Sequence, residues 1–540
     1  MFAYECYSLR SLKTGGLIDI PAAAFYSCYK LTSIDFTSFT SIGVSAFQYS
    51  GIESITIPAN CTIIKENAFD HSALSKITFE ARITGIELTI MYCAFSNTLL
   101  SSISFPVEVE FGNDELDESH CLANCSKLES IHFEDDFYRI PAYFANLCTN
   151  LKSVVAKGVT TIKRDAFHLC INLETVTFDR VTYFGAYCYS YCSKLNMQFE
   201  ETLDVDFYTN AFEFCESLSF SKVSSNWKLH GNEVFKGCSG LTALKIAAPL
   251  VESTFKGCKE LKSVEILENI TEIPSYCFKN CTKLTSFKYT NGLKSVDEEA
   301  FASTSLSGTF DFTDISIGDF AFESSEIEEV TIGREIYDYV FRNCTKLKTV
   351  YINSSQFNLR SFINTSSDIE FKLGSGAEDL KIEGNILVGY PEYIKPAKIL
   401  TAVLPNYDEK SLTISKFTHI SEYAFSLCKK LSEVIADTNI SFYENNFAYS
   451  NVETVEIKDC GNLFIPDNTF TKAHSLKKVI ISAKILGIGE EAFSDCYKLK
   501  TVELPSFVKE IRERAFFKCY YLKSIDISNV NLIHSEAFKY

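Results

Sequence analysis

Apolar residues recur along this chain in a unit of about 23 residues. One copy reads Ile-Gly-Glu-Glu-Ala-Phe-Ser-Asp-Cys-Tyr-Lys-Leu-Lys-Thr-Val-Glu-Leu over residues 488–504. The same order of apolar and polar positions returns at 511–527 and, more than three hundred residues earlier, at 162–178. A fixed period of this length is typical of proteins whose coils stack into a solenoid, so the chain is expected to grow by stacking.

Each unit has two halves with different periodicities. The half exemplified by Leu522, Ile525 and Ile527 ends in apolar alternation, which predicts a short strand. The other half, Ile-x-x-x-Ala-Phe-x-x-Cys, is spaced like a helix but is too short for a stable free helix. We therefore expect an α/β-type solenoid of about 22 stacked coils, with a parallel β-sheet on one face and short helical or 3₁₀ turns and loops on the other.

The phenylalanine of the second half provides an anchor for each unit. This gives 23 anchors, of which 21 are Phe, and most are separated by 19 to 24 residues. The anchors are Phe2, Phe25, Phe47, Phe69, Phe95, Leu122, Phe144, Phe167, Cys188, Phe212, Phe235, Phe255, Phe278, Phe301, Phe322, Phe341, Phe362, Phe425, Phe447, Phe470, Phe493, Phe516 and Phe538.

The rhythm breaks most strongly between Phe362 and Phe425, where 63 residues separate two anchors. Two apolar runs, at 382–388 and 399–405, flank turn-rich sequence there and predict a β-hairpin insertion. We expect a repeat array over 1–370, the insertion over 371–411, and an array over 412–540 that continues the same solenoid. A partial hinge at the insertion is the alternative. A shorter acidic run at 114–118 predicts a solvated bulge.

These two halves resemble the BspA-like leucine-rich repeats, also described as the Treponema pallidum type. The pattern of that family runs Leu-x-x-Ile-x-Ile-Pro and then, after a variable stretch, Ile-x-x-x-Ala-Phe-x-x-Cys; residues 499–505 and 511–519 match it. The resemblance implies a leucine-rich repeat solenoid. It also implies a non-enzymatic surface antigen or adhesin, which binds host matrix proteins or other microbes.

The charge and the termini bear on partners and location. A net charge of −18 makes nucleic acid an unfavourable partner. No stretch approaches 18 consecutive apolar residues, so no membrane insertion is expected. The first residues show no basic start followed by an apolar run, so no signal peptide is predicted. A cell-surface location rests on the resemblance, and a cytoplasmic one is the alternative.

The 20 cysteines raise the possibility of disulfide, metal or thiol chemistry. Most of them share one column, three or four residues after the anchor, which other units fill with Ser, Thr or Ala. A column that accepts these side chains requires a small residue in a tight interior turn, so reduced, buried thiols are expected. No zinc motif or oriented thiol–histidine pair is found, so we expect no catalytic residues, no metal and no cofactor. A cysteine-based redox sensor is a less favoured reading.

The candidate binding surface is the outward side of the strands. Alternation exposes the residues on either side of the central Ile or Val of each strand. The column before it is rich in Ser and Thr, whereas the column after it varies in charge and size. We expect this face to bind a protein partner or a glycan; an elongated spacer without a specific ligand is the alternative. The candidate residues are Lys245, Glu265, Lys288, Asp311, Tyr351, Glu456, Glu503 and Asp526.

Overall fold

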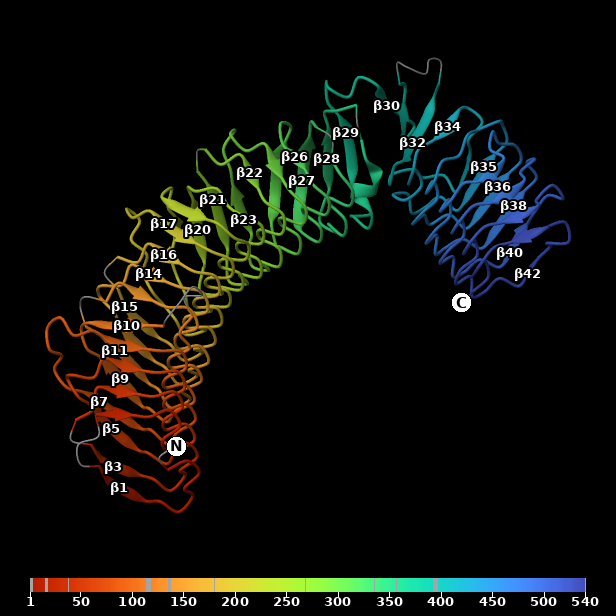
Figure 1. The fold of residues 1–540 in the computed structure, drawn as a ribbon. Helices are drawn as coiled ribbons and strands as arrows, with labels where there is room; N and C mark the ends of the chain where they lie inside the picture. Colours follow the sequence, from red (N-terminus) through yellow and green to blue (C-terminus); the bar gives the residue numbers. More distant parts are fainter. Residues whose placement is uncertain are drawn as a thin grey trace. The chain divides into compact units, whose positions relative to one another are not determined.

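In the computed structural model the chain forms two compact units, residues 1–293 and 294–540, each a stack of coils (Figure 1). Only Glu118 of the acidic run at 114–118 is described, so the predicted bulge lies outside the described residues. The structure describes residues 3–14, 18–36, 38–112, 118–134, 137–178, 180–267, 269–334, 336–355, 357–391 and 397–539.

Most coils contribute strands to two rows. The first strand row contains the segments predicted from Leu-x-x-Ile-x-Ile, and the second row contains shorter strands that lead into the Ala-Phe turn. Within both rows neighbouring strands pair in parallel, because each coil repeats the direction of the one before it. The chain is therefore a parallel-strand solenoid, as the period predicts.

In unit 1 the two rows run side by side through the stack. The first row contains β1 (Ser11–Thr14), β3 (Ser33–Phe36), β5 (Ser54–Ile57), β7 (Lys76–Phe79), β9 (Ser102–Phe105), β11 (Ser130–Phe133), β13 (Ser153–Val155), β15 (Thr175–Thr177), β18 (Lys222–Val223), β20 (Ala243–Ile246), β21 (Ser263–Ile266) and β23 (Ser286–Lys288). The second row contains β2 (Asp19–Ile20), β4 (Ser41–Ile42), β6 (Ile63–Ile64), β8 (Leu88–Ile90), β10 (Val109–Phe111), β12 (Arg139–Ile140), β14 (Thr161–Ile162), β16 (Tyr183–Phe184), β17 (Val205–Phe207), β19 (Trp227–Leu229) and β22 (Glu272–Ile273).

Unit 2 has the same two rows. The first contains β25 (Ser307–Phe312), β27 (Glu326–Ile332), β28 (Thr349–Ile352), β29 (Glu370–Leu373), β33 (Ser411–Thr413), β35 (Glu433–Ala436), β36 (Thr454–Ile457), β38 (Lys478–Ile481), β40 (Thr501–Glu503) and β42 (Ser524–Ile525). The second contains β24 (Ser295–Val296), β26 (Ser316–Ile317), β34 (His419–Ile420), β37 (Phe464–Ile465), β39 (Gly487–Ile488), β41 (Glu510–Ile511) and β43 (Leu532–Ile533).

The interval between Phe362 and Phe425 contains antiparallel strands. Strands β30 (Leu380–Glu383) and β31 (Ile386–Gly389) form an antiparallel hairpin. Strand β32 (Ile399–Val403) then pairs antiparallel with β31 and parallel with β34 of the second row. The hairpin is thus part of a three-stranded meander that joins the second row on one side.

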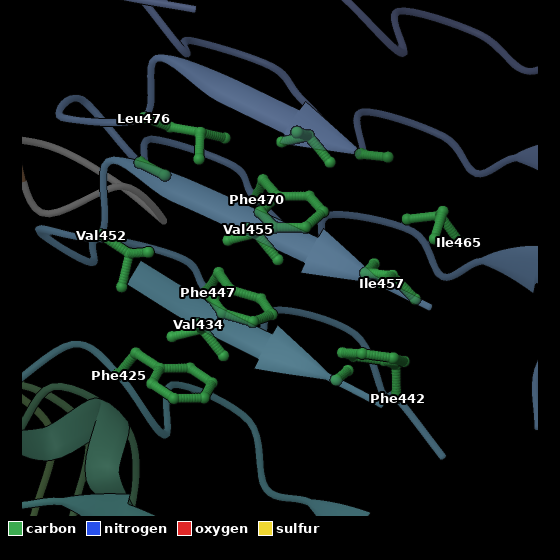
Figure 2. Packing of buried hydrophobic residues seen from close by; sticks show 14 of the residues in the cluster. Phe425, Val434, Phe442, Phe447, Val452, Val455, Ile457, Ile465, Phe470 and Leu476 are labelled. Atoms are coloured by element: carbon green, nitrogen blue, oxygen red, sulfur yellow. The ribbon is translucent and has the colours of Figure 1, made fainter. Parts of the chain in front are cut away.

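Phenylalanine rings fill the space between the rows. Figure 2 shows Phe425, Phe447 and Phe470 lying one above another, with Val434 of β35 and Val455 of β36 beside them. Their ring centroids are 4.4 and 4.9 Å apart, within the range at which offset-stacked aromatic pairs stabilise a fold. The core is therefore continuous from coil to coil, which is what a solenoid needs because one coil cannot bury its own apolar side.

The α-helical form of the predicted turns is not confirmed. Among the described residues the one helix is a four-residue 3₁₀ helix, η1 (Leu359–Phe362). In the other turns, successive backbone N–H groups donate alternately within the coil and to the next coil. The N–H of Cys496 donates to the carbonyl of Phe493 in its own coil at 3.3 Å. The N–H of Phe493 donates to the carbonyl of Ala515 in the next coil at 2.7 Å. The i→i−4 bond of an α-helix is absent because the neighbouring coil supplies the acceptor instead.

Residues with positive φ allow this alternation. Glu491 (φ 49°) and Asp495 (φ 59°) lie two residues on either side of Phe493. Their N–H groups donate to the next coil at 3.1 and 2.9 Å. The left-handed conformation costs a non-glycine residue roughly 1 kcal/mol, and the bonds along the stack offset that cost.

The turn geometry corrects two anchors. In the coil of Phe144 the anchor position belongs to Ala145, whose carbonyl accepts the thiol of Cys170 as anchor carbonyls do elsewhere. In the coil of Cys188 the anchor position belongs to Tyr189, whose ring stacks with the anchor rings of the neighbouring coils. The anchor is therefore identified as the residue three positions before the Cys column, and not as the nearest large apolar residue.

Candidate interaction surface

In unit 1 three candidate residues are direct neighbours on the outward side of the first row. Lys245 on β20 pairs in register with Glu265 on β21, and Glu265 pairs with Lys288 on β23. The Lys245 ammonium lies 3.4 Å from a Glu265 carboxylate oxygen. Both side chains are substantially exposed, so this ion pair contributes little to stability. It does fix an alternating charge pattern on a rigid sheet.

In unit 2 the sheet β25–β27–β28–β29 carries Asp311 and Tyr351. The two residues are separated by Thr331 in register, and Lys372 follows on the other side of Tyr351. The Lys372 ammonium lies 5.4 Å from the centroid of the Tyr351 ring, a cation–π distance. Asp311 Oδ1 instead accepts hydrogen bonds from the N–H and hydroxyl of Thr313, so this carboxylate closes a turn.

The remaining candidates lie along the C-terminal sheet. Glu456 on β36 and Glu503 on β40 flank Ile480 on β38. The Lys478 ammonium forms an ion pair with a Glu503 carboxylate oxygen at 2.7 Å. Asp526 follows β42 and accepts the N–H of Ser528, a bond that holds the pKa of its carboxyl below the ordinary value. Glu503 and Asp526 directly follow the paired residues Val502 and Ile525 and are therefore neighbours, whereas Ile480 separates Glu503 from Glu456.

The structure adds residues that the pattern missed. Lys222 on β18 lies in register with Lys245, and Thr331 and Lys372 extend the column of Tyr351. The alternation at Phe371, Lys372 and Leu373 was a signal for Lys372, but it stands in the long interval between anchors. Lys222 lies between residues 218 and 234, where the repeat pattern is blurred, so there is no clear unit with which to align it.

The cysteine column is interior. The thiols of Cys496 and Cys519 each donate to the anchor carbonyl of the preceding coil at 3.1 Å, and both side chains are buried. Burial raises the pKa of Cys258 and of Cys519 to about 12. Thiolates are the reactive form of cysteine, so burial makes these residues poor nucleophiles.

His168 and Cys170 are close in the sequence but do not form a thiol–histidine pair. Cys170 donates its thiol to Ala145 at 3.2 Å, and burial raises its pKa to about 12. His168 lies edge-on to the rings of Tyr187 and Tyr191. In the described part of the chain, no group of three or more His, Cys, Asp or Glu residues could hold a metal ion. None of its helices is long and apolar enough to cross a membrane.

Comparison with known families identifies the repeat. The family model described as "BspA type Leucine rich repeat region (6 copies)" matches residues 1–116, 88–196, 117–242, 205–316, 308–381, 404–463 and 463–540. The chain belongs to the BspA-type leucine-rich repeat family. The resemblance seen in the sequence is thereby confirmed, together with the leucine-rich repeat fold. Members of this family generally act in protein interaction and at surfaces, and are generally non-enzymatic.

Solved structures of bacterial leucine-rich repeat proteins resemble this BspA-type chain. One from Bacteroides ovatus is 19% identical, with 81% of this chain and 84% of that chain covered and a TM-score of 0.32. A leucine-rich cell surface protein from Faecalibacterium prausnitzii is 16% identical, with 89% and 87% covered and a TM-score of 0.27. The T. pallidum leucine-rich repeat protein is 18% identical, with 43% and 83% covered and a TM-score of 0.20. No curated protein matches the chain.

Proposed function

We propose that this BspA-type protein is a non-enzymatic binding protein that recognises a protein partner through the outward side of its first strand row. The observation that carries the proposal is the placement of Tyr351. Its half-buried ring sits between Thr331 and Lys372 on paired strands. Tyr is enriched among the residues that dominate binding energy, because it offers a large contact area at little entropic cost.

The rigid backbone around these residues supports the same proposal. Strand pairing holds the backbones of Glu265 and Lys288 in register, so no backbone has to be ordered when a partner binds. An alternating row of charges gives specificity and a faster encounter with a complementary surface. The adhesive form of the function, with a host matrix or cell-surface protein as partner, extends what the family resemblance implies.

The test compares two triple variants of the full chain. One replaces the candidate residues (Glu265→Ala, Lys288→Ala, Tyr351→Ala). The other replaces small hydroxyl residues in the neighbouring column of the same strands (Ser263→Ala, Ser286→Ala, Thr349→Ala). Binding to a panel of purified extracellular-matrix glycoproteins is measured by biolayer interferometry. We expect the first triple to raise the dissociation constant at least tenfold, about 1.4 kcal/mol, and the second to change it by less than about threefold.

The second candidate function is an elongated spacer without a specific ligand. It is favoured by the ion pairs between neighbouring coils, such as Lys478 with Glu503, because these outward charges are already paired within the chain. Absence of binding by the wild-type protein would favour the spacer, and equal binding by the wild-type protein and both triple variants would remove the basis for recognition by the sheet. Loss of binding in the Glu265, Lys288, Tyr351 triple variant alone would exclude the spacer function.

A further inference from the structure

The stack of turns in unit 2 is interrupted at the meander. Phe341 and Phe362 stack at 5.6 Å, and the column resumes with Phe425 and Phe447 at 4.4 Å. No backbone hydrogen bond joins the turn at 361–366 to the turn at 421–428 in the described chain. The end of β32 packs on the turn at 421–428, where the N–H of Val403 donates to the carbonyl of Ala424 at 2.8 Å, but no described residue of the meander lines the space between the two turns.

That space is a pocket of about 450 Å³. Its volume lies within the range of about 300–1,000 Å³ found for small-molecule sites. Arg360 spans the two sides: its guanidinium binds Asp338 on one side and Glu422 at 3.1 Å on the other. It also lies 4.9 Å from the centroid of the Tyr423 ring. These contacts hold the walls in a fixed relation without filling the space between them.

The lining has a charge opposite to that of the whole chain. Lys429, Lys472 and His474 line the pocket, and none of its lining residues is Asp or Glu, although the net charge of the protein is −18. Partial burial lowers the pKa of His474, so the two lysines carry the positive charge. The neighbouring carboxylate of Asp495 does not line the pocket and is engaged by the Tyr497 hydroxyl at 2.9 Å.

Two hydroxyl groups in the lining have no hydrogen-bond partner. Ser450 is 3% exposed, and its Oγ is one of them; the buried Oγ of Ser426 is the other. These two oxygens have almost no accessible surface, so the polar groups offered to a ligand are the exposed side chains of Thr345 and Asn364 and the half-buried side chain of Asn451. Beside them, the half-buried ring of Tyr449 holds the Lys472 ammonium, which donates to its hydroxyl at 3.1 Å.

We propose that this junction pocket binds an acidic monosaccharide unit, a sugar ring that carries a carboxylate. The lysines pair with the carboxylate, and charge-assisted bonds of this kind are about twice as strong as neutral ones. The side chains of Thr345, Asn364 and Asn451 bond the sugar hydroxyls. The Tyr449 ring covers an apolar face of the sugar. This site is separate from the strand face, because none of the residues proposed to bind protein lines the pocket.

The test titrates the full chain with D-glucuronate by isothermal titration calorimetry, with D-glucose as the neutral match and acetate and inorganic sulfate as simple anions. We expect glucuronate to bind at least tenfold more tightly than glucose, acetate or sulfate. The double variant Lys429→Gln, Lys472→Gln should weaken glucuronate binding at least tenfold. The matched variant Lys416→Gln, Lys500→Gln replaces exposed lysines outside the pocket and should leave glucuronate binding unchanged.

A smaller change separates recognition from stability. Asn451→Ala should weaken glucuronate binding about threefold to tenfold without lowering the thermal midpoint, because this side chain lines the pocket and is only half-buried. No glucuronate binding up to about 10 mM would overturn the proposal. So would full binding by the Lys429, Lys472 double variant, or equal binding of sulfate and glucuronate, which would identify a simple anion site. The triple variant of the strand face should bind glucuronate normally, so the two proposals can fail independently.

Discussion

The thiol of Cys519 donates to the main-chain carbonyl of Phe493, one coil earlier, at 3.1 Å. The same carbonyl accepts the N–H of Cys496 in its own coil at 3.3 Å, so both of its lone pairs are used. A serine in this column does not reach: Ser50 is 3% exposed and its Oγ has no partner. The C–S bond is longer than the C–O bond, so cysteine extends far enough to link consecutive coils.

We therefore predict that Ser50→Cys stabilises the protein. The new thiol should donate to the anchor carbonyl of the preceding coil, and the unpaired hydroxyl disappears. The expected gain is about 1 kcal/mol in the free energy of unfolding, measured from the urea midpoint under reducing conditions. Ser50→Ala is the control, since it removes the hydroxyl without adding a donor. If the alanine variant is as stable as the cysteine variant, the thiol bond contributes nothing.

Tyr189 gives a second prediction. Its ring lies between those of Phe167 (5.3 Å) and Phe212 (5.4 Å), and its fully buried hydroxyl has no partner. Tyr189→Phe keeps the stack and removes the orphan group, so it should raise the free energy of unfolding by about 1–2 kcal/mol. Tyr191→Phe, at a site that is 40% exposed, should change it by less than about 0.5 kcal/mol. A loss of stability in Tyr189→Phe would contradict the assignment.

The buried thiols predict a loss of stability in alkali. Burial raises the pKa of Cys170 from 9.0 to about 12, so between these values the thiol is protonated in the folded chain and ionised in the unfolded one. The unfolded state then binds fewer protons, and the free energy of unfolding should fall by about 1.4 kcal/mol per pH unit for each such thiol. Below pH 9 this contribution is fully present.

The measurement is the free energy of unfolding between pH 9 and 11 for wild type and Cys170→Ala. The variant should lose less stability over this range, because one ionising group is gone; alanine already occupies the same column at Ala473. Ser72→Ala, in the same column without a thiol, should show the wild-type slope. Identical slopes for Cys170→Ala and wild type would mean that this thiol is not protected from ionisation.

The ion pairs of Arg360 should stabilise the junction between the two turns of unit 2. Its side chain is 25% exposed and forms ion pairs with both Asp338 and Glu422. Arg360→Ala should cost about 2 kcal/mol and speed amide hydrogen exchange in the turns at 361–366 and 421–428. Glu422→Gln removes only the more exposed pair and should cost less than about 1 kcal/mol. Unchanged exchange in both turns would show that the meander alone holds the junction.

The sequence predicted the repeating frame well, because burial imposes a period on side-chain type. Phe493 and Phe516 stand 23 residues apart in the chain, and their rings stack at 4.9 Å. The alternation of Thr501, Val502 and Glu503 likewise predicted which side chains face outward. The helical form of the turn is not confirmed, because the spacing of Phe and Cys does not reveal that the N–H of Phe493 bonds to the next coil rather than to its own.

The sequence by itself determined the stacked coils, the strand that each contributes and the columns that are buried, since these follow from the spacing of apolar residues within one unit. The tertiary structure decided what depends on contacts between units. It placed Lys222 beside Lys245 and Lys372 beside Tyr351, although their own segments lack a clear repeat. It also formed the junction pocket. The anchors of the two turns that line this pocket are 63 residues apart in the chain, and only stacking brings the turns together.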